Sequence, residues 1–341
     1  MSYSSNWSFV NWITHELCKI PLDEQKAPTL WPSSATATID DKVLGKCRRQ
    51  AYFRYATDLY NFSPDYSHLE ELVQAIKANK LPPSLYTQWI WKQGELYEQH
   101  CVDLARDSGI FVGTQVSTYI PKFNVSGKID LIVLNPEQST YHIVEVKSVY
   151  GFNANSVIGT DANHRMNKLG EPRDAHLMQL GIYQWWYGNP KEWGPGILLY
   201  GARDTGRAAE YLVTVEEVDG LDCIFYQGQY PVKTEKVNSG ITIQSIMANY
   251  QMIMDCAANN TMPDKDFELV YSQDKIDAMY EAGLLNKTDT AQYERRKKQI
   301  EEGKTKLTKE VIKGDWQCRL CDYKKICYPD APDVEDGESQ E

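Results

Sequence analysis

The stretch that decides the fold reads Gly127-Lys128-Ile129-Asp130-Leu131-Ile132-Val133-Leu134 and, after a short turn, His142-Ile143-Val144-Glu145-Val146-Lys147. Both runs are rich in apolar and β-branched residues, which are typical of strands. The four residues 135–138, Asn-Pro-Glu-Gln, favour a tight turn, because proline fixes φ and asparagine tolerates turn conformations. The sequence therefore predicts a two-stranded hairpin with its turn centred between Glu137 and Gln138.

This register brings three charged side chains together. Asp130 is expected opposite Glu145, and the Cβ atoms of opposed residues lie about 4.5–5.5 Å apart. Side chains alternate along a strand, so Glu145 and Lys147 share one face while Val144 and Val146 point to the other. Two carboxylates at this distance repel unless a cation lies between them, and hard oxygen ligands suit Mg²⁺ or Mn²⁺. We therefore predict a divalent-metal site here; the alternative is a hairpin face that carries solvated charges.

Composition limits the class of protein. The 341 residues suffice for one large domain or two, and the formal net charge of −11 argues against binding nucleic acid through bulk electrostatics. No apolar run reaches the roughly 18 residues of a membrane span, and the first ten residues lack the features of a signal peptide. We expect a protein of the cytoplasm, the host's cytoplasm if the source is a virus.

A basic and aromatic segment lies near the N-terminus. Pro32-Ser33-Ser34 predicts a helix start, and the helix is expected to continue through Tyr55. Residues 41–55 carry five lysines and arginines together with Tyr52, Phe53 and Tyr55. Either the rings stack on unpaired bases while the cations hold phosphates, or the helix is amphipathic and packs its rings inward.

Further elements follow from apolar periodicity and turn residues. We expect helices at 69–78, 84–107, 174–187 and 241–259, and strands at 112–120, 196–202 and 210–215. The polar segment 151–172 is expected to be a loop that either closes over a substrate or is disordered. Residues 218–240 allow no assignment, and residues 264–313 are expected to be mostly helical.

Three of the eight cysteines stand close together near the C-terminus. The spacing Cys318-x2-Cys321-x5-Cys327 lets a tight turn aim thiolates at one metal ion or cluster. Cys47, among basic residues far upstream, is the best candidate for a fourth ligand. A zinc knuckle is the alternative, although zinc sites more often show two close cysteine pairs. The scattered cysteines are expected to be buried free thiols: Cys18, Cys101, Cys223 and Cys256.

These features, in this order, resemble the RecB-like branch of the PD-(D/E)XK nucleases, and within it the iron–sulfur members such as the AddB-type and CRISPR-associated exonucleases. The matching pieces are Cys47 in Gly45-Lys46-Cys47-Arg48-Arg49-Gln50-Ala51-Tyr52, Asp130, Glu145-Val146-Lys147, Gln179-x3-Tyr183, and Cys318, Cys321 and Cys327. The resemblance covers residues 33–217 and 314–329. It departs from the family in one helix, where Gly94-x-x-x-Glu98 stands in place of Gly-x-x-x-His, with His100 as an alternative site residue.

The resemblance implies a site and an architecture. Its metal, Mg²⁺ or Mn²⁺, would be held by Glu98, Asp130, Glu145 and the Val146 carbonyl. Lys147 would position or activate water, and Gln179 and Tyr183 would contact DNA or support the site. A [4Fe–4S] cluster on Cys47, Cys318, Cys321 and Cys327 would be a structural staple.

The expected fold is α/β, a PD-(D/E)XK core with a mixed sheet flanked by helices. Its parts would be an arm at 1–32, a nuclease core at 33–217, a mostly helical insertion at 218–313, the cysteine segment at 314–329 closing onto Cys47, and a disordered acidic tail at 330–341.

The function implied is metal-dependent hydrolysis of DNA, with exonuclease action on single strands or ends. Two alternatives stay open: a structure- or sequence-specific endonuclease of defence or repair, and a non-catalytic subunit that binds DNA ends. Nothing in the sequence distinguishes DNA from RNA, because no feature is specific for a 2′-hydroxyl group.

Overall fold

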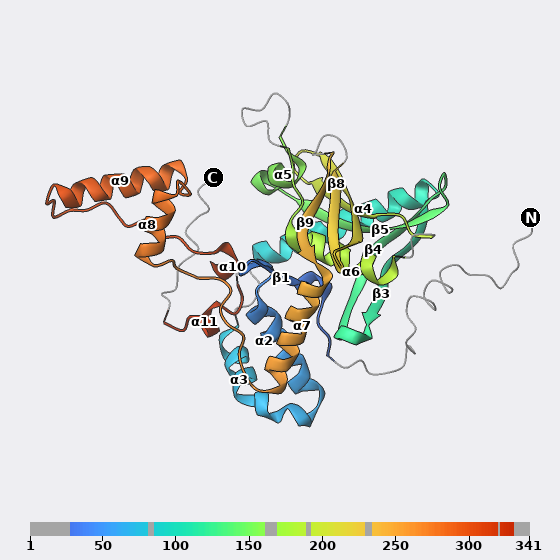
Figure 1. Cartoon of the computed structure of the whole chain (residues 1–341), viewed down its shortest axis with the longest axis horizontal. Coiled ribbons are helices and arrows are strands. Elements are labelled where there is room, and N and C mark those ends of the chain that lie inside the picture. Colours follow the sequence, from blue (N-terminus) through green and yellow to red (C-terminus); the bar gives the residue numbers. More distant parts are fainter. Residues whose placement is uncertain are drawn as a thin grey trace, which may run out of the picture. The chain divides into compact units, whose positions relative to one another are not determined.

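The computed structural model describes residues 28–80, 85–160, 169–188, 192–228, 234–319 and 321–330 (Figure 1). It divides into two units, which are described separately. The first comprises Met1–Val73 and Pro83–Pro263, and the second comprises Gln74–Pro82 and Asp264–Glu341.

The first unit is built on a seven-stranded mixed sheet. Its strand order is β3-β4-β5-β6-β7-β8-β9. The β5–β6 pair is parallel, and the other neighbouring pairs are antiparallel. The strands are β3 (Phe111–Ile120), β4 (Val125–Asn135), β5 (Thr140–Val149), β6 (Gly196–Ala202), β7 (Ala208–Val218), β8 (Leu221–Gly228) and β9 (Lys236–Thr242). The chain therefore has the expected α/β class with a mixed sheet.

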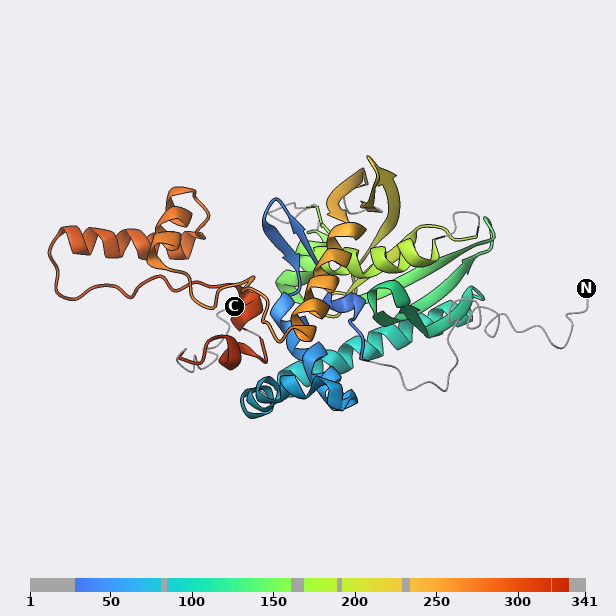
Figure 2. The same cartoon turned by 60° about the horizontal axis from the view of Figure 1, so that its bottom comes forward.

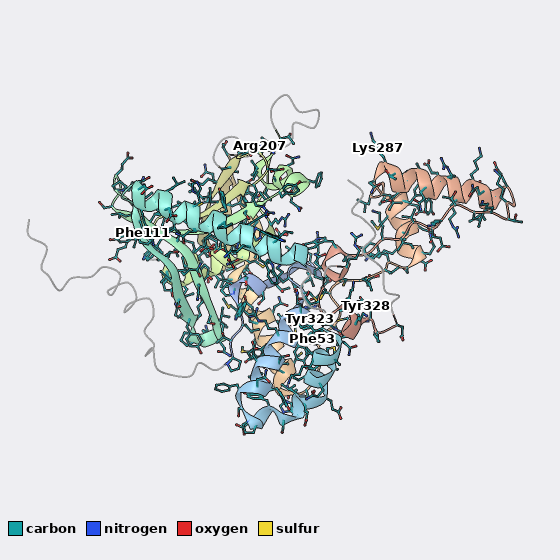
Figure 3. All side chains as sticks on the ribbon, turned by 180° about the vertical axis from the view of Figure 1, so that it is seen from behind. Phe53, Phe111, Arg207, Lys287, Tyr323 and Tyr328 are labelled. Atoms are coloured by element: carbon teal, nitrogen blue, oxygen red, sulfur yellow. The ribbon has the colours of Figure 1, made fainter. Side chains whose placement is uncertain are left out.

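Two helices cover opposite faces of the sheet (Figure 2). Helix α4 (Leu85–Asp107) precedes β3 and packs Val102 and Ala105 on Val144 and Val146 of β5. Helix α6 (Asp174–Tyr187) lies in the connection between β5 and β6, as a parallel pair requires, and contacts β5, β6, β7 and β8. Seen from behind, α4 lies across the strands, and Arg106 of its last turn stands over the ring of Phe111 at 4.6 Å (Figure 3).

The central hairpin has the predicted register. Leu131 pairs with Val144 and Ile132 with Ile143, which centres the turn between Glu137 and Gln138. The Asn135 side chain accepts the N–H groups of Glu137 and Gln138, at 3.0 and 3.4 Å. This local bond closes the turn, so turn chemistry and apolar pattern agree on one register.

The N-terminal part of the first unit differs from the prediction. Instead of one helix from Pro32 through Tyr55, the chain forms η1 (Pro32–Ser34), the hairpin β1 (Thr36–Ile39) and β2 (Lys42–Gly45), and then α2 (Arg48–Phe62). Asp40 and Asp41 have φ of 47° and 62°, and this left-handed pair turns the chain back on itself.

The rings of α2 point into the protein. Tyr52, Phe53 and Tyr55 are buried, with 1%, 0% and 7% of their surface exposed. Helix α2 packs on α7 (Ile243–Ala258), which follows β9. The alternative in which this helix packs its rings inward is therefore confirmed, and these three rings do not form a surface for bases.

Two other expectations need correction. Residues 218–242 are not part of a helical insertion, because β8 and β9 extend the main sheet through this stretch. The segment 151–172 is not wholly a loop, because it starts with helix α5 (Gly151–Ile158). Its residues 161–168 lie outside the described residues, as do 1–27 of the predicted arm and 331–341 of the predicted tail.

The remaining short elements of the N-terminal half are η2 (Pro64–Leu69), α3 (Glu70–Asn79) and η3 (Pro121–Phe123). The second unit contains α8 (Gln273–Glu281), α9 (Lys287–Glu301), α10 (Trp316–Arg319) and α11 (Lys324–Cys327). Helices α8 and α9 stack the rings of Tyr280 and Tyr293 at 4.3 Å. The Asp315 carboxylate accepts the N–H of Glu268 and the hydroxyl of Tyr271, at 2.8 and 2.6 Å, which fixes the chain before α10. No helix among the described residues is long and apolar enough to cross a membrane.

Candidate active site

The structure brings Asp130, Glu145 and Lys147 to one place on the sheet. Lys147 Nζ donates to Glu145 Oε1 at 2.5 Å. The Leu131–Val144 pair is the last of the β4–β5 ladder, and beyond it the Val146 N–H donates to Asp130 Oδ2 at 2.9 Å. The Asp130 carboxylate therefore lies between the two strands, where their backbone pairing ends.

Glu145 is the most deeply buried member of this group. Its side chain is fully buried, and its Oε2 has no hydrogen-bond partner within the described residues. Burial raises the pKa of Glu145 to about 8, against the opposing charge of Lys147. A buried carboxylate oxygen that lacks a donor is costly, and a metal ion would supply the missing partner. The donor set therefore fits a hard divalent cation.

Lys147 is placed to remain charged. Burial alone would lower its pKa, but the charges of Glu145 and Asp130 raise the pKa above its ordinary value. Its ammonium group is therefore a fixed cation beside Asp130 and Glu145 at neutral pH.

Helix α4 contributes Glu98 rather than His100. The Glu98 carboxylate accepts a hydrogen bond from the Gln115 side chain, and burial and the charge of Asp130 raise its pKa. His100 is exposed on the same helix. Across the described ranges, no group of three or more His, Cys, Asp or Glu side chains is arranged as a metal site, so the role of Glu98 as third ligand stays a prediction.

Gln179 and Tyr183 lie beneath the site. The Tyr183 hydroxyl donates to the Lys128 carbonyl at 3.0 Å, and Gln179 hydrogen-bonds to the same hydroxyl. The two side chains are 8% and 1% exposed. Tyr183 reaches the hairpin because Gly127 has no side chain; a Cβ there would come within 2.5 Å of the hydroxyl oxygen. This burial favours the supporting role over direct contact with DNA.

Sequence analysis missed a second cationic group next to Lys147. Packing and the charges of Lys147 and Arg173 lower the pKa of Lys46, and burial and the charges of Lys147, Arg173 and Lys46 hold the pKa of His176 well below its ordinary value. His176 precedes Gln179 and Tyr183 by three and seven residues, a spacing that places all three on one helix face. This spacing was the sequence feature that could have identified His176 as a neighbour of the site.

Tyr200 ties this cationic group to the site. It is the neighbour of Lys147 in the parallel β5–β6 pair. Its hydroxyl accepts the Arg173 N–H at 3.1 Å and lies 2.8 Å from Nδ1 of His176. The N-terminal end of α6 is thereby held against the strand that carries Lys147.

The three C-terminal cysteines lie close together within the second unit. Burial, together with the neighbouring Cys321, Asp315 and Cys327, raises the pKa of Cys318 to about 12. Burial and Cys327 raise the pKa of Cys321 to about 11. The three thiols are not arranged as a metal site in the described part of the chain, so their role as ligands stays a prediction.

The other cysteines are spread through the first unit. Cys47 is the residue before α2 and is half-buried, and its role as the fourth ligand stays a prediction. Cys223 is buried, Cys101 and Cys256 are half-buried, and Cys18 lies outside the described residues.

Comparison with known proteins gives no relative for this chain. No protein-family description, curated protein or solved structure matches it.

Proposed function

We propose that the first unit is a metal-dependent nuclease that hydrolyses phosphodiester bonds of DNA, acting as an exonuclease on single strands or ends. We further propose that its core is a PD-(D/E)XK fold of the RecB-like, iron–sulfur kind. The observation that carries the proposal is the unpartnered, buried Oε2 of Glu145 beside Asp130 and Lys147.

The residues divide the work as follows. Asp130, Glu145 and the Val146 carbonyl would hold Mg²⁺ or Mn²⁺, with Glu98 as the further ligand from α4. A bound divalent cation activates water and neutralises charge on a phosphate. Lys147 keeps Glu145 oriented through its 2.5 Å bond and offers its remaining N–H donors to water or to a phosphate oxygen.

The cations around Tyr200 support a phosphate substrate. Lys46 and Arg173 add positive charge next to Lys147, while His176 is neutral at pH 7 because its pKa is low. The positive charge of Lys46, Arg173 and Lys147 favours binding of a polyanion near the carboxyl groups, even though the whole chain has a net charge of −11.

The cysteine segment would hold a structural [4Fe–4S] cluster, with zinc as the alternative metal. Cys318, Cys321 and Cys327 supply three thiols within the second unit, and the sequence predicts Cys47 as the fourth. The proposal gives the cluster no redox role.

Digestion of end-labelled single- and double-stranded DNA with Mn²⁺ tests the activity. The unmodified chain is expected to shorten linear DNA from one end, and comparison of the two labelled ends gives the polarity. Asp130→Asn and Lys147→Ala should each abolish cleavage. The matched control is Glu137→Gln, which changes an exposed carboxylate in the turn of the same hairpin.

Three outcomes would change the proposal. Full activity in Asp130→Asn or Lys147→Ala would show that the site is misplaced. Cleavage of a closed circular single strand would favour the endonuclease alternative. DNA-end binding without cleavage under any divalent cation would favour a non-catalytic subunit.

A further inference from the structure

Two aromatic side chains stand exposed just beyond Lys147. Tyr150 follows the end of β5 and Phe152 lies in the first turn of α5, and they are 58% and 75% exposed. Other large rings of the first unit, such as Tyr52 and Tyr183, are buried in its core. Exposed rings of this size next to a candidate site indicate a binding surface.

The exposure of Phe152 is not the result of a helix without a partner. Helix α5 already buries Ala154, Val157 and Ile158, and it contacts β6 and β7. Phe152 is therefore on the outer side of a helix whose apolar face is satisfied.

The helix is also firmly anchored. Arg207 donates to the Gly159 carbonyl and to the Asn155 side chain, at 2.8 and 2.7 Å, and lies beside α5 (Figure 3). The Tyr211 hydroxyl donates to the Val157 carbonyl at 2.6 Å. A ring on such a support is preorganised for a ligand.

Cationic side chains flank the two rings. The guanidinium of Arg203 stands 6.0 Å from the centre of the Tyr150 ring, and its backbone N–H donates to the Val149 carbonyl at 3.0 Å. Its Nε is buried and has no hydrogen-bond partner in the described part of the chain. Arg173 donates to the side chain of Asn153, the residue after Phe152, at 2.7 Å.

Asp204 brings a negative charge to the same turn. Its carboxylate accepts the Gly151 N–H at 3.0 Å, at the start of α5, and so faces a donor of the helix end rather than the rings. The surroundings of Tyr150 and Phe152 therefore combine π faces with guanidinium groups.

The distance to the site suits a nucleic-acid strand. Tyr150 is three residues beyond Lys147, which is about 10 Å along an extended chain. That corresponds to about three nucleotides at the spacing of a stacked strand. Because Tyr150 is extended and three residues beyond Lys147, its side chain points to the other face of the strand, the side on which Arg203 bonds to Gln93 of α4. A strand cut beside Lys147 would therefore pass around the end of β5 to bring its neighbouring bases to the two rings.

From these contacts we infer that Tyr150, Phe152 and Arg203 form a platform on which unpaired bases of the substrate stack. The inference rests on the proposed function and narrows its substrate to single-stranded nucleic acid at this position. Inside a duplex the base faces are covered by the neighbouring pairs, so Tyr150 and Phe152 can stack on successive bases only where these are unpaired. Aromatic stacking is the usual way in which proteins hold single strands without reading their sequence.

Helix α4 extends the same surface. Gln93 bonds to the Arg203 guanidinium, and Trp89 lies one helical turn earlier on that side with 60% of its surface exposed. Trp89 is the candidate for a further stacking position.

The test measures binding in the full chain carrying Asp130→Asn, so that no strand is cut. The probe is a short fluorescein-labelled single strand, and a second probe carries 2-aminopurine, whose emission falls when the base stacks. Phe152→Ala and Tyr150→Ala should each raise the Kd for the single strand about 5- to 150-fold, which is the loss of about 1–3 kcal/mol of stacking per base. Phe152→Trp should keep both the affinity and the quenching.

Phe62→Ala is the matched control, because Phe62 is an exposed phenylalanine at the end of α2, 45% exposed. It should bind single strands as the unmodified surface does. Equal Kd values for Phe152→Ala and Phe62→Ala would overturn the platform. A chain that self-associates, with Phe152→Ala becoming monomeric while its Kd for the strand is unchanged, would also overturn it in favour of a protein interface.

Failure of the nuclease proposal looks different. It would appear as absence of cleavage by the unmodified chain with Mn²⁺, whatever the binding variants show. Loss of binding in Tyr150→Ala or Phe152→Ala would still support the platform in that case.

Discussion

Acidification should weaken metal binding at this site by a predictable amount. Burial raises the pKa of Glu145 to about 8, and a protonated carboxyl cannot serve as a ligand. At about pH 8 half of the Glu145 side chains are ionised, and at about pH 6 only about 1% are, so affinity should fall about 50-fold between these values. Above about pH 8 the affinity should level off. The raised pKa of Glu98 acts in the same direction.

The raised pKa of Glu145 also makes the stability of the metal-free chain depend on pH. The ordinary pKa is 4.5, so between about pH 4.5 and pH 8 the metal-free folded chain holds a proton at Glu145 that the unfolded chain has lost. The contribution of Glu145 to the free energy of unfolding should therefore fall as the pH rises through this window. Bound metal should reverse that trend, because it stabilises the ionised form.

Titration with Mn²⁺, followed by the electron paramagnetic resonance signal of the free ion, gives the dissociation constant at each pH. Glu145→Gln should bind Mn²⁺ weakly and without this pH dependence. Glu137→Gln, in the exposed turn, should behave as the unmodified chain does. A dissociation constant that changes less than about threefold over the range, or the same pH dependence in Glu145→Gln, would refute the assignment of Glu145 as the titrating ligand.

Three further predictions concern the support of the site and the cysteine segment. Gly127→Ala should lower the free energy of unfolding, measured in urea, by about 1–3 kcal/mol, because its Cβ would meet the Tyr183 hydroxyl at 2.5 Å. The control Gly94→Ala should leave that free energy unchanged or raise it by up to about 1 kcal/mol, because its Cβ would have only an ordinary contact at 3.7 Å. Tyr183→Phe should cost about 1 kcal/mol of stability, since the Lys128 carbonyl loses its donor, yet leave Mn²⁺ binding intact; complete loss of cleavage at unchanged stability would show that the hydroxyl touches substrate. Anaerobically purified protein should be brown and contain iron, and Cys321→Ser should lose both; colourless protein with one equivalent of zinc would support the zinc knuckle.

Local sequence signals located the elements that carry the site. The helix predicted at 174–187 is α6, with the same bounds, and the hairpin has the predicted register. Both succeeded because local sequence sufficed: apolar strands around Asn135 for the hairpin, and the acidic Asp174, which suits the first turn of a helix, for the start of α6. A one-residue slip would have turned Glu145 and Lys147 to the face of α4, so the apolar pattern fixed the site as well as the strand.

Elements that depend on distant partners were not predicted. The helical spacing of Val43, Leu44 and Cys47 continues into α2, yet residues 36–45 form a hairpin because Asp40 and Asp41 adopt left-handed conformations. Strand β8 did carry a local signal that the prediction left unused, because Asp219-Gly220 forms the two-residue turn that pairs it with β7, with φ of 52° and 79°. Strand β9 is identified by its pairing with β8. The sequence did not predict that Lys46 and Arg173 lie near Lys147, because they are far from it in sequence and approach it only in the folded chain.

The division of the chain has a practical consequence for dissecting the protein. The second unit takes Gln74–Pro82 from the interior of the first and the rest from Asp264 onward, so the polypeptide passes between the units at three points. Within the second unit, Lys80 of the inner segment lies 5.2 Å from the ring of Tyr323, which is 6% exposed. A stop codon after Pro263 would therefore leave nine residues of the second unit stranded without the segment they pack on. Isolating the first unit calls for two edits of the gene, one that ends it after Pro263 and one that replaces residues 74–82, whereas isolating the second unit calls for joining residues 74–82 to Asp264.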